Sequence, residues 1–168
     1  RYNHCGFLGR TVSDCALGQN IVSGPHPRDH DSLRDRVVIP DRFDDRPLRI
    51  AFSMDLGYLP VDGDVRANTE AALDVFRAAG CQVKAVDLGW DARVDVAAMT
   101  WYLTMHFGRA PLWALDRYRN QMTDYAVATA EAAARLQPDE IARSWDVQHQ
   151  MQQGFGAIME DHDVFLCP

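Results

Sequence analysis

The sequence contains almost no lysine. Lys84 is the only lysine among 17 basic residues, and the others are arginines. It lies in the run 82–88, where alternation with Val83 predicts a strand whose lysine faces solvent or covers the sheet. Chemistry that needs a lysine base or a lysine Schiff base is therefore excluded everywhere except at this one position.

The sequence also lacks a recognisable hydrolase nucleophile. None of its serines lies in a GxSxG motif, which rules out a nucleophile elbow, and none is followed by lysine at SxxK spacing. The serines are Ser13, Ser23, Ser32, Ser53 and Ser144. Because no serine has a base at motif spacing to take its proton, we expect this stretch to be inactive by itself.

Clustered cysteines, glycine-rich loops and long apolar runs are absent as well. The four cysteines, at positions 5, 15, 81 and 167, form no CxxC pair, so we expect reduced, buried thiols and no zinc site. The loop after the first predicted strand has one glycine, not the three that a dinucleotide pyrophosphate requires. No run approaches the ~20 apolar residues of a membrane helix. We expect no cofactor, no metal and no membrane contact.

The composition is typical of a folded domain. Hydrophobic residues make up 47% and charged residues 24% of the 168 positions, and the formal net charge is −7. Nucleic acid repels such a chain unless a basic patch is segregated, and the sequence has no such patch. We therefore expect a cytoplasmic domain that binds no nucleic acid; a homodimer is one assembly that the sequence leaves open.

Both ends of the sequence resemble internal positions of a longer protein. It starts at Arg1 without an initiator methionine or a signal peptide, and it stops within the apolar run 164–168. Natural C termini seldom lie inside a buried strand. We therefore expect a portion of a longer chain.

One helix and one long connector are predicted at the start. Thr11 and Asp14 have capping-box spacing, and Gly24 followed by Pro25 ends the helix, since glycine tolerates a left-handed conformation and proline cannot continue. Residues 25–47 contain four prolines and charges of both signs. This composition predicts a connector that crosses the surface.

The next segment predicts a strand–helix–strand unit. The runs 48–53 and 82–88 have strand patterning, and between them a helix opens at Asp62 and closes at Gly80. A unit of this length predicts two parallel strands and a right-handed crossover. The predicted fold class is therefore α/β.

After this βαβ unit the sequence is mostly helical. Helical periodicity covers 91–108, 111–118, 123–136 and 138–160, with Pro138 at the first position of the last helix. Its apolar face is predicted to include Trp145. The run 164–167 predicts a third, buried strand. The chain is thus one predicted domain fragment, 1–168: helix start (1–24), connector (25–47), βαβ unit (48–88), helical variable region (89–160) and final strand (161–168).

Three places are candidates for a site. The loop 54–60 follows a strand, where open α/β sheets place ligands, so Asp55 or Tyr58 can line a pocket or serve ordinary loop roles. The segment 26–31 offers two histidines and two aspartates to a metal, but its two prolines and turn-forming composition explain the segment without one. The apolar stripe of the variable region is the third candidate, as core or as the wall of a substrate pocket; its residues are Met99, Trp101, Met105, His106 and Phe107.

Four segments in order resemble the amidase signature family. Residues 6–14 (GFLGRTVSD) resemble that family's GP-x-A-R-T-V-x-D helix start, and 23–29 (SGPHPRD) its A-G-P-D-P-R-D connector. Residues 48–62 resemble its L-R-I-A-x-x-x-D-L-G…P-V-D strand and loop, and 161–168 its closing Y-D-V-L-L-x-P-T strand. Leu8-Gly9 and His26 depart from these patterns, which leaves the subfamily open.

The resemblance implies a mixed-sheet α/β sandwich that hydrolyses a small-molecule amide. The family uses a serine nucleophile, a second serine that relays protons, a lysine base and an oxyanion hole of backbone amides. All of these lie upstream of the segment at Gly6, so the resemblance assigns no catalytic residue here. The variable stretch after Leu88 is then the part expected to contribute to the substrate pocket. Two alternatives stay open: an amidotransferase-type subunit or non-catalytic relative, and a stand-alone binding module that uses the loop 26–31.

Overall fold

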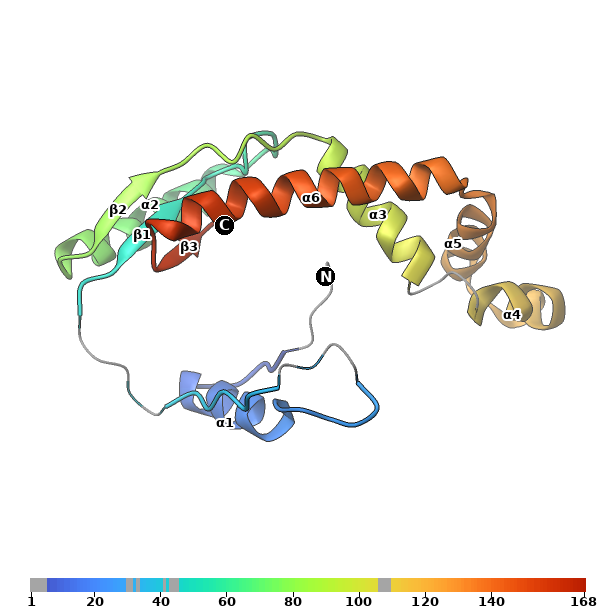
Figure 1. Cartoon of the computed structure of the whole chain (residues 1–168), viewed down its shortest axis with the longest axis horizontal. Coiled ribbons are helices and arrows are strands. Elements are labelled where there is room, and N and C mark those ends of the chain that lie inside the picture. Colours follow the sequence, from blue (N-terminus) through green and yellow to red (C-terminus); the bar gives the residue numbers. More distant parts are fainter. Residues whose placement is uncertain (1–5, 30–31, 33, 41, 43–45, 106–109) are drawn as a thin grey trace. The chain divides into compact units, whose positions relative to one another are not determined.

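The computed structural model contains two units, which are described separately (Figure 1). The first unit comprises residues 1–46 and the second comprises 47–168. The structure describes residues 6–29, 32, 34–40, 42, 46–105 and 110–168.

The described residues of the first unit contain one helix, α1 (Val12–Val22). The predicted capping box is confirmed: the amide of Asp14 donates to Thr11 Oγ1 at 3.1 Å, and the amide of Thr11 donates to Asp14 Oδ2 at 3.2 Å. The helix ends at the predicted place, with Ser23 as C-cap and Gly24 at a φ of 133°. These local contacts define the helix without any buried residue on it.

A side chain of α1 holds the connector. Asn20 Nδ2 donates to the carbonyl of Ile39 at 2.9 Å, and the amide of Ile39 donates to Asn20 Oδ1 at 2.8 Å. The side-chain amide of Asn20 thus bonds both the N–H and the C=O of Ile39, as a residue of a neighbouring strand would. Residues 37–39 form no strand.

The second unit is built on a three-stranded sheet. The strands are β1 (Arg49–Phe52), β2 (Gln82–Ala85) and β3 (Val164–Leu166), in the order β2-β1-β3. Strand β2 runs parallel to β1, as the βαβ pattern predicts, and β3 is parallel to β1 as well. The helix α2 (Gly63–Ala78) connects β1 to β2. The core of this layer consists of Ile50 and Ala51 from β1 and Leu73 from α2, each at most 1% exposed.

The remaining elements form a helical layer. They are α3 (Arg93–Met105), α4 (Ala110–Tyr118), the 3₁₀ helix η1 (Arg119–Gln121), α5 (Asp124–Arg135) and α6 (Pro138–Glu160). Pro138 occupies the first turn of α6 as predicted. Thr123 caps α5 through a 3.3 Å bond from the amide of Ala126 to its hydroxyl. Helix α3 packs against α6 and α5, and Ala97, Leu103 and Ala130 are buried there.

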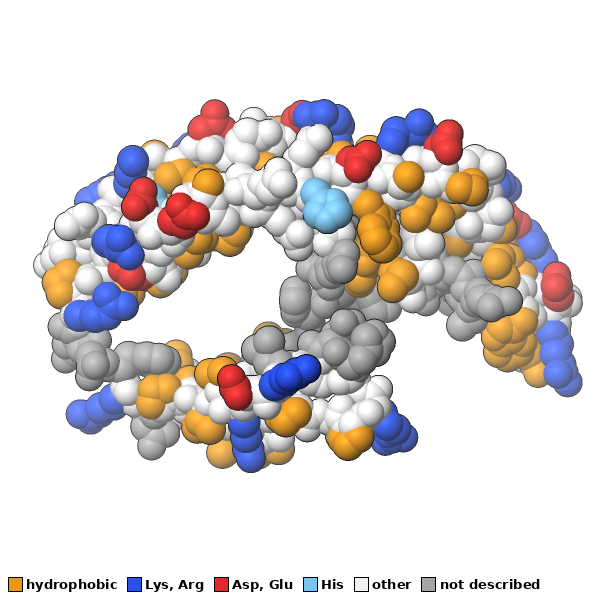
Figure 2. Space-filling model, in the orientation of Figure 1, with side chains coloured by type: hydrophobic (Ala, Val, Ile, Leu, Met, Phe, Trp, Pro, Cys, Tyr) orange, Lys and Arg blue, Asp and Glu red, His pale blue; other side chains and the backbone are white. Residues whose placement is uncertain are grey.

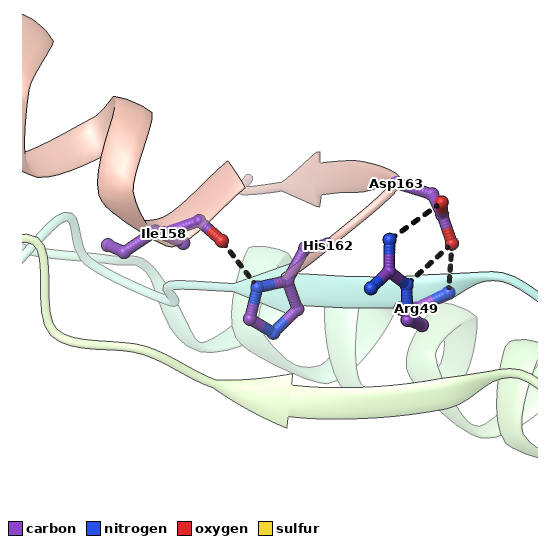
Figure 3. A network of polar contacts seen from close by, with 4 residues as sticks. All are labelled: Arg49, Ile158, His162 and Asp163. Carbon is purple, nitrogen blue, oxygen red and sulfur yellow. Dashed lines mark hydrogen bonds and ion pairs between the residues drawn. The ribbon is translucent and has the colours of Figure 1, made fainter. Parts of the chain in front are cut away.

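A polar clamp joins the amino ends of β1 and β3 (Figure 3). Asp163 accepts the backbone amide of Arg49 at 2.9 Å and its guanidinium at 3.2–3.3 Å. In return, the amide of Asp163 donates to the carbonyl of Arg49 at 2.8 Å. The hydrogen bond and charge of Asp163 raise the pKa of Arg49. This reciprocal pairing fixes the register of β3 beside β1.

Two sequence expectations about burial are wrong. Cys167 was expected in a buried strand, but it lies just beyond β3 and is exposed. Trp145 was expected on the apolar face of α6, yet it is 50% exposed, while Ser144 and Gln148 are buried. The position of the partner helix, and not hydrophobicity alone, decides which face of α6 is covered. Small and polar side chains therefore lie in the contact of α6 with its neighbours.

Candidate functional site

The loop after β1 forms a tight turn at the carboxyl edge of the sheet. The carboxylate of Asp55 accepts the amide of Gly57 at 2.9 Å, and the carbonyl of Asp55 accepts the amides of Tyr58 and Leu59. Leu56 and Gly57 have φ angles of 51° and 90°. Two successive left-handed residues reverse the chain, and a glycine accommodates the second at no steric cost.

A pocket of about 220 Å³ lies at this edge. It is lined by residues 54–56 and 59–62 of the loop, by Val65 in the first turn of α2, and by Pro168 just after β3. The carboxyl edge of a parallel sheet is where open α/β folds place ligands. Of the two residues that the sequence offered as pocket lining, Asp55 lines this cavity and Tyr58 does not.

The same loop is joined to the stretch that follows β2. The hydroxyl of Tyr58 donates to Asp95 Oδ1 on α3 at 2.7 Å. A Cβ atom at position 57 would lie 3.1 Å from the carbonyl oxygen of Trp90, so the glycine permits a close backbone approach. Desolvation, followed by the hydrogen bond to Asp95, raises the pKa of Tyr58 to about 12.

A second cavity, of about 250 Å³, lies between α3 and α6. Its lining residues are Arg93, Val96, Ala97 and Thr100 from α3, with Glu140, Arg143, Ser144 and Val147 from α6. The hydroxyls of Thr100 and Ser144 donate to carbonyls of their own helices, at 2.8 and 2.7 Å. Both hydroxyls are therefore already hydrogen-bonded within their helices, and the floor of the cavity is largely apolar.

Charged side chains surround that floor. Arg93 is held by Asp91, with guanidinium-to-carboxylate distances of 2.8–3.0 Å. Hydrogen bonds from Arg93 lower the pKa of Asp91. Glu140 accepts the amide of Gln137 at 2.8 Å and so belongs to the cap of α6. An apolar floor with charged groups at its margin suits an aryl or alkyl group better than a small polar one.

The residues predicted to form a substrate wall are only partly described. Met99 and Met105 are 57% and 67% exposed on α3, and Trp101 is half-buried. His106 and Phe107 lie outside the described residues. The α3 side of the cavity is formed by other positions, which share the spacing i, i+3, i+4, i+7 from Arg93. The small residues Ala97 and Thr100 in that pattern were the available sequence signal.

Three of the five serine hydroxyls take part in hydrogen bonds within the chain. Ser144 donates to a helix carbonyl, Ser32 donates to the carbonyl of Asp29 at 2.8 Å, and Ser23 accepts from Gln19 at 2.8 Å. Ser53 is buried at the end of β1, and Lys84 is exposed on β2.

The segment 26–31 is a turn in its described part. The amide of Arg28 donates to His26 Nδ1 at 3.2 Å, and the amide of Asp29 donates to the carbonyl of His26 at 3.0 Å. His30 and Asp31 lie outside the described residues. Among the residues that the structure covers, no three histidine, cysteine or acidic side chains gather into a group able to hold a metal ion.

Hydrophobic side chains also lie at the surface of both units (Figure 2). In the helical layer they include Trp113 on α4 and Tyr125 on α5, which are 59% and 66% exposed. Within the described ranges, no helix combines the length and apolar character needed to cross a bilayer.

These features define the class of the second unit: an α/β unit with a small pocket at the carboxyl edge of a parallel sheet and a second cavity in its helical layer. The chain belongs to the amidase signature family, because the family model for amidases matches it over residues 1–168.

Relatives agree with this assignment. The chain is 26% identical over 166 residues to an acylamidase of Rhodococcus erythropolis, covering 97% of this chain and 35% of the relative. It is 29% identical over 136 residues to a glutamyl-tRNA(Gln) amidotransferase subunit of Pelobacter propionicus, covering 78% of this chain and 22% of that protein. A crystal structure of a bacterial aryl acylamidase of the amidase signature family superimposes with a TM-score of 0.79 at 22% identity, over 95% of this chain and 35% of that one.

The last comparison confirms the predicted fold class. The chain spans about a third of the length of the acylamidase it matches, and less of the amidotransferase protein.

Proposed function

We propose that this chain is the pocket-forming, downstream part of an amidase that hydrolyses a carboxylic amide to an acid and ammonia or an amine. The serine nucleophile, the relay serine and the lysine base belong, in this proposal, to polypeptide upstream of Arg1. The observation that carries it is the family match over the whole sequence, together with the similarity to an acylamidase along 97% of the chain.

The two cavities support a contributing role. At about 220 and 250 Å³, each is smaller than the ~300–1,000 Å³ typical of sites that enclose a ligand. Each can hold a ring or a short alkyl group, and the remaining walls would come from other polypeptide. The apolar floor between α3 and α6 favours an aryl or alkyl amide as substrate.

The sequence itself supports placing the catalytic residues in other polypeptide. Lys84 is the only lysine, it is exposed, and no serine stands at motif spacing from it. A Ser–Ser–Lys mechanism needs the base within hydrogen-bond reach of a serine. The catalytic residues of the proposed reaction are therefore assigned outside these 168 positions.

The test compares the full-length protein with this stretch alone. Release of an arylamine from an anilide is measured for both, with and without a serine-directed phosphonate. We expect hydrolysis by the full-length protein, inhibition by the phosphonate, and no hydrolysis by residues 1–168. A full-length protein that releases no amine from any anilide or alkyl amide would contradict the proposal, and so would turnover by the isolated stretch.

A second candidate is a component of an amidotransferase, which the 29% identity over 136 residues to the Pelobacter propionicus protein favours. Such a component hands ammonia to a partner instead of releasing it. Ammonia release is therefore measured with and without candidate partner proteins. Strong stimulation by a partner would favour this second function, and full activity without one would favour the first.

A further inference from the structure

The loop after β1 and the helix α3 meet through one side-chain hydrogen bond. Tyr58 in the loop donates to Asp95 at 2.7 Å, although 37 residues separate them in the sequence. The close approach of Gly57 to the carbonyl of Trp90 brings the same two segments together at a second point. Two independent contacts thus connect the loop 54–60 with the stretch 90–95.

The local structure around Tyr58 and around Asp95 holds each side chain in place for this hydrogen bond. The left-handed pair Leu56 and Gly57 reverses the chain just before Tyr58, and the amide of Tyr58 is bound to the carbonyl of Asp55 at 3.1 Å. Asp95 lies in the first turn of α3, where the helix dipole stabilises a carboxylate. The hydroxyl and its acceptor are therefore held by their own elements before they meet.

Each segment also lines one of the two cavities. The loop from Met54 to Asp62 forms most of the pocket at the sheet edge. Helix α3 carries Arg93 and Val96, on either side of Asp95, into the cavity against α6. A contact between loop and helix therefore sets how one cavity wall stands relative to the other.

The hydroxyl of Tyr58 is unsuited to chemistry. Its pKa is raised to about 12, so the phenol keeps its proton at neutral pH and is no base. Its proton is donated to Asp95, so it is not offered to a substrate. What remains is a role in holding the two segments together.

We propose that Tyr58 and Asp95 form a latch that positions the loop 54–60 against α3 for substrate binding. This inference rests on the proposed amidase function. Tyr58 is a positioning residue, not a catalytic one. An anilide with a bulky acyl group contacts more of the site than a small aliphatic amide does, so its binding is expected to depend more strongly on the latch.

The test uses the full-length protein with four variants. Tyr58→Phe and Asp95→Ala break the hydrogen bond, and Asp95→Asn keeps a side-chain oxygen that can accept it. Tyr125→Phe is the matched control, because Tyr125 is exposed on α5 and its observed bond uses its backbone carbonyl. KM and kcat are measured for the bulky anilide and for the small amide.

We expect Tyr58→Phe and Asp95→Ala to raise KM for the anilide about fivefold, the equivalent of one hydrogen bond, with kcat changed less than about twofold. KM for the small amide stays unchanged, and Asp95→Asn and Tyr125→Phe resemble the wild type. Equal effects on both substrates, a loss of kcat alone, or the same change in Tyr125→Phe would overturn the latch.

A second measurement separates the latch from the amidase proposal. Hydrogen exchange at the amides of residues 58 and 59, which are bound to Asp55, is compared between Tyr58→Phe and Tyr125→Phe. Faster exchange in Tyr58→Phe alone supports the latch, and equal exchange overturns it. A wild type that hydrolyses no amide contradicts the proposed function, whichever way the exchange result falls.

Discussion

The two units of this chain are stabilised in different ways. In the first unit, α1 has a complete capping box, yet none of its residues is buried, and Val12 and Ile21 are 87% and 71% exposed. In the second unit, Ile50 and Leu73 are each 1% exposed in a layer of helix on sheet. Local hydrogen bonds define an element in one case, and burial of apolar surface stabilises it in the other. Within the described residues of the first unit, the capping box and the backbone bonds define α1 without a buried side chain.

The largest effect that tests this comparison is loss of core volume. Leu73→Ala leaves a cavity beneath α2, and we expect the free energy of unfolding to fall by about 2–5 kcal/mol. The matched change in the first unit is Leu17→Ala, at a side chain that is 62% exposed. It is expected to cost less than about 0.5 kcal/mol, as surface changes do. Denaturant unfolding measures both, and similar costs would contradict the contrast between the units.

The clamp between β1 and β3 is expected to come second. Asp163→Ala removes the acceptor of the amide and the guanidinium of Arg49. We expect the thermal midpoint to fall by about 4 °C, since an unsatisfied amide and an unpaired guanidinium remain at the sheet. The control is Asp74→Ala, whose pair with Arg77 lies on the surface of α2. If Asp74→Ala lowers the midpoint as much as Asp163→Ala does, the clamp contributes no more to stability than a surface ion pair.

Removing a helix N-cap is expected to have a smaller effect on stability, and the effect should differ between the two units. Thr11→Ala and Thr123→Ala each remove one N-cap, a loss of about 1 kcal/mol of helix stability. Because α1 has no buried residue and α5 buries Ala130, we expect Thr123→Ala to lower global stability. Thr11→Ala is expected to increase amide exchange only within α1. Circular dichroism during urea unfolding and site-resolved exchange measure the two effects. A global loss in Thr11→Ala would mean that α1 is part of a cooperative core.

The smallest expected effect is a pH dependence at Tyr58. Its pKa is raised in the folded state, so its contribution to stability is complete below the unfolded value of about 10 and is lost as pH rises through about 12. In Tyr58→Phe this loss is absent. The difference in urea midpoint between wild type and variant is therefore expected to shrink between about pH 9 and pH 12. A difference that grows over this range would show that the sign is wrong.

Local sequence signals predicted the elements well. The cap at Thr11, the first-turn Pro138 and the glycine with a φ of 84° at position 80 all stand where the sequence placed them. The parallel pairing of β1 with β2 followed from the length of the crossover. These signals act over a few residues, or over one connection, and so they are readable without the rest of the fold.

Helix faces were predicted less well. On α3 the apolar stripe through Trp101 and Met105 was singled out, whereas the buried positions are Ala97, Thr100 and Leu103. On α6, Gln148 is buried and Trp145 is half-exposed. Small residues allow two helices to approach closely, so the crossing itself selects them. The sequence of one helix does not show where its partner helix will cross it.

By itself, the sequence determined the family, the α/β class, the order of the elements and the lack of a GxSxG or SxxK motif. Those properties depend on residue types at short spacings and on their order along the chain. Only the tertiary structure decided that Tyr58 meets Asp95, that Asp163 clamps Arg49, and that cavities lie at the sheet edge and between α3 and α6. These contacts join residues that are far apart in the sequence, and their distances exist only once the chain has folded.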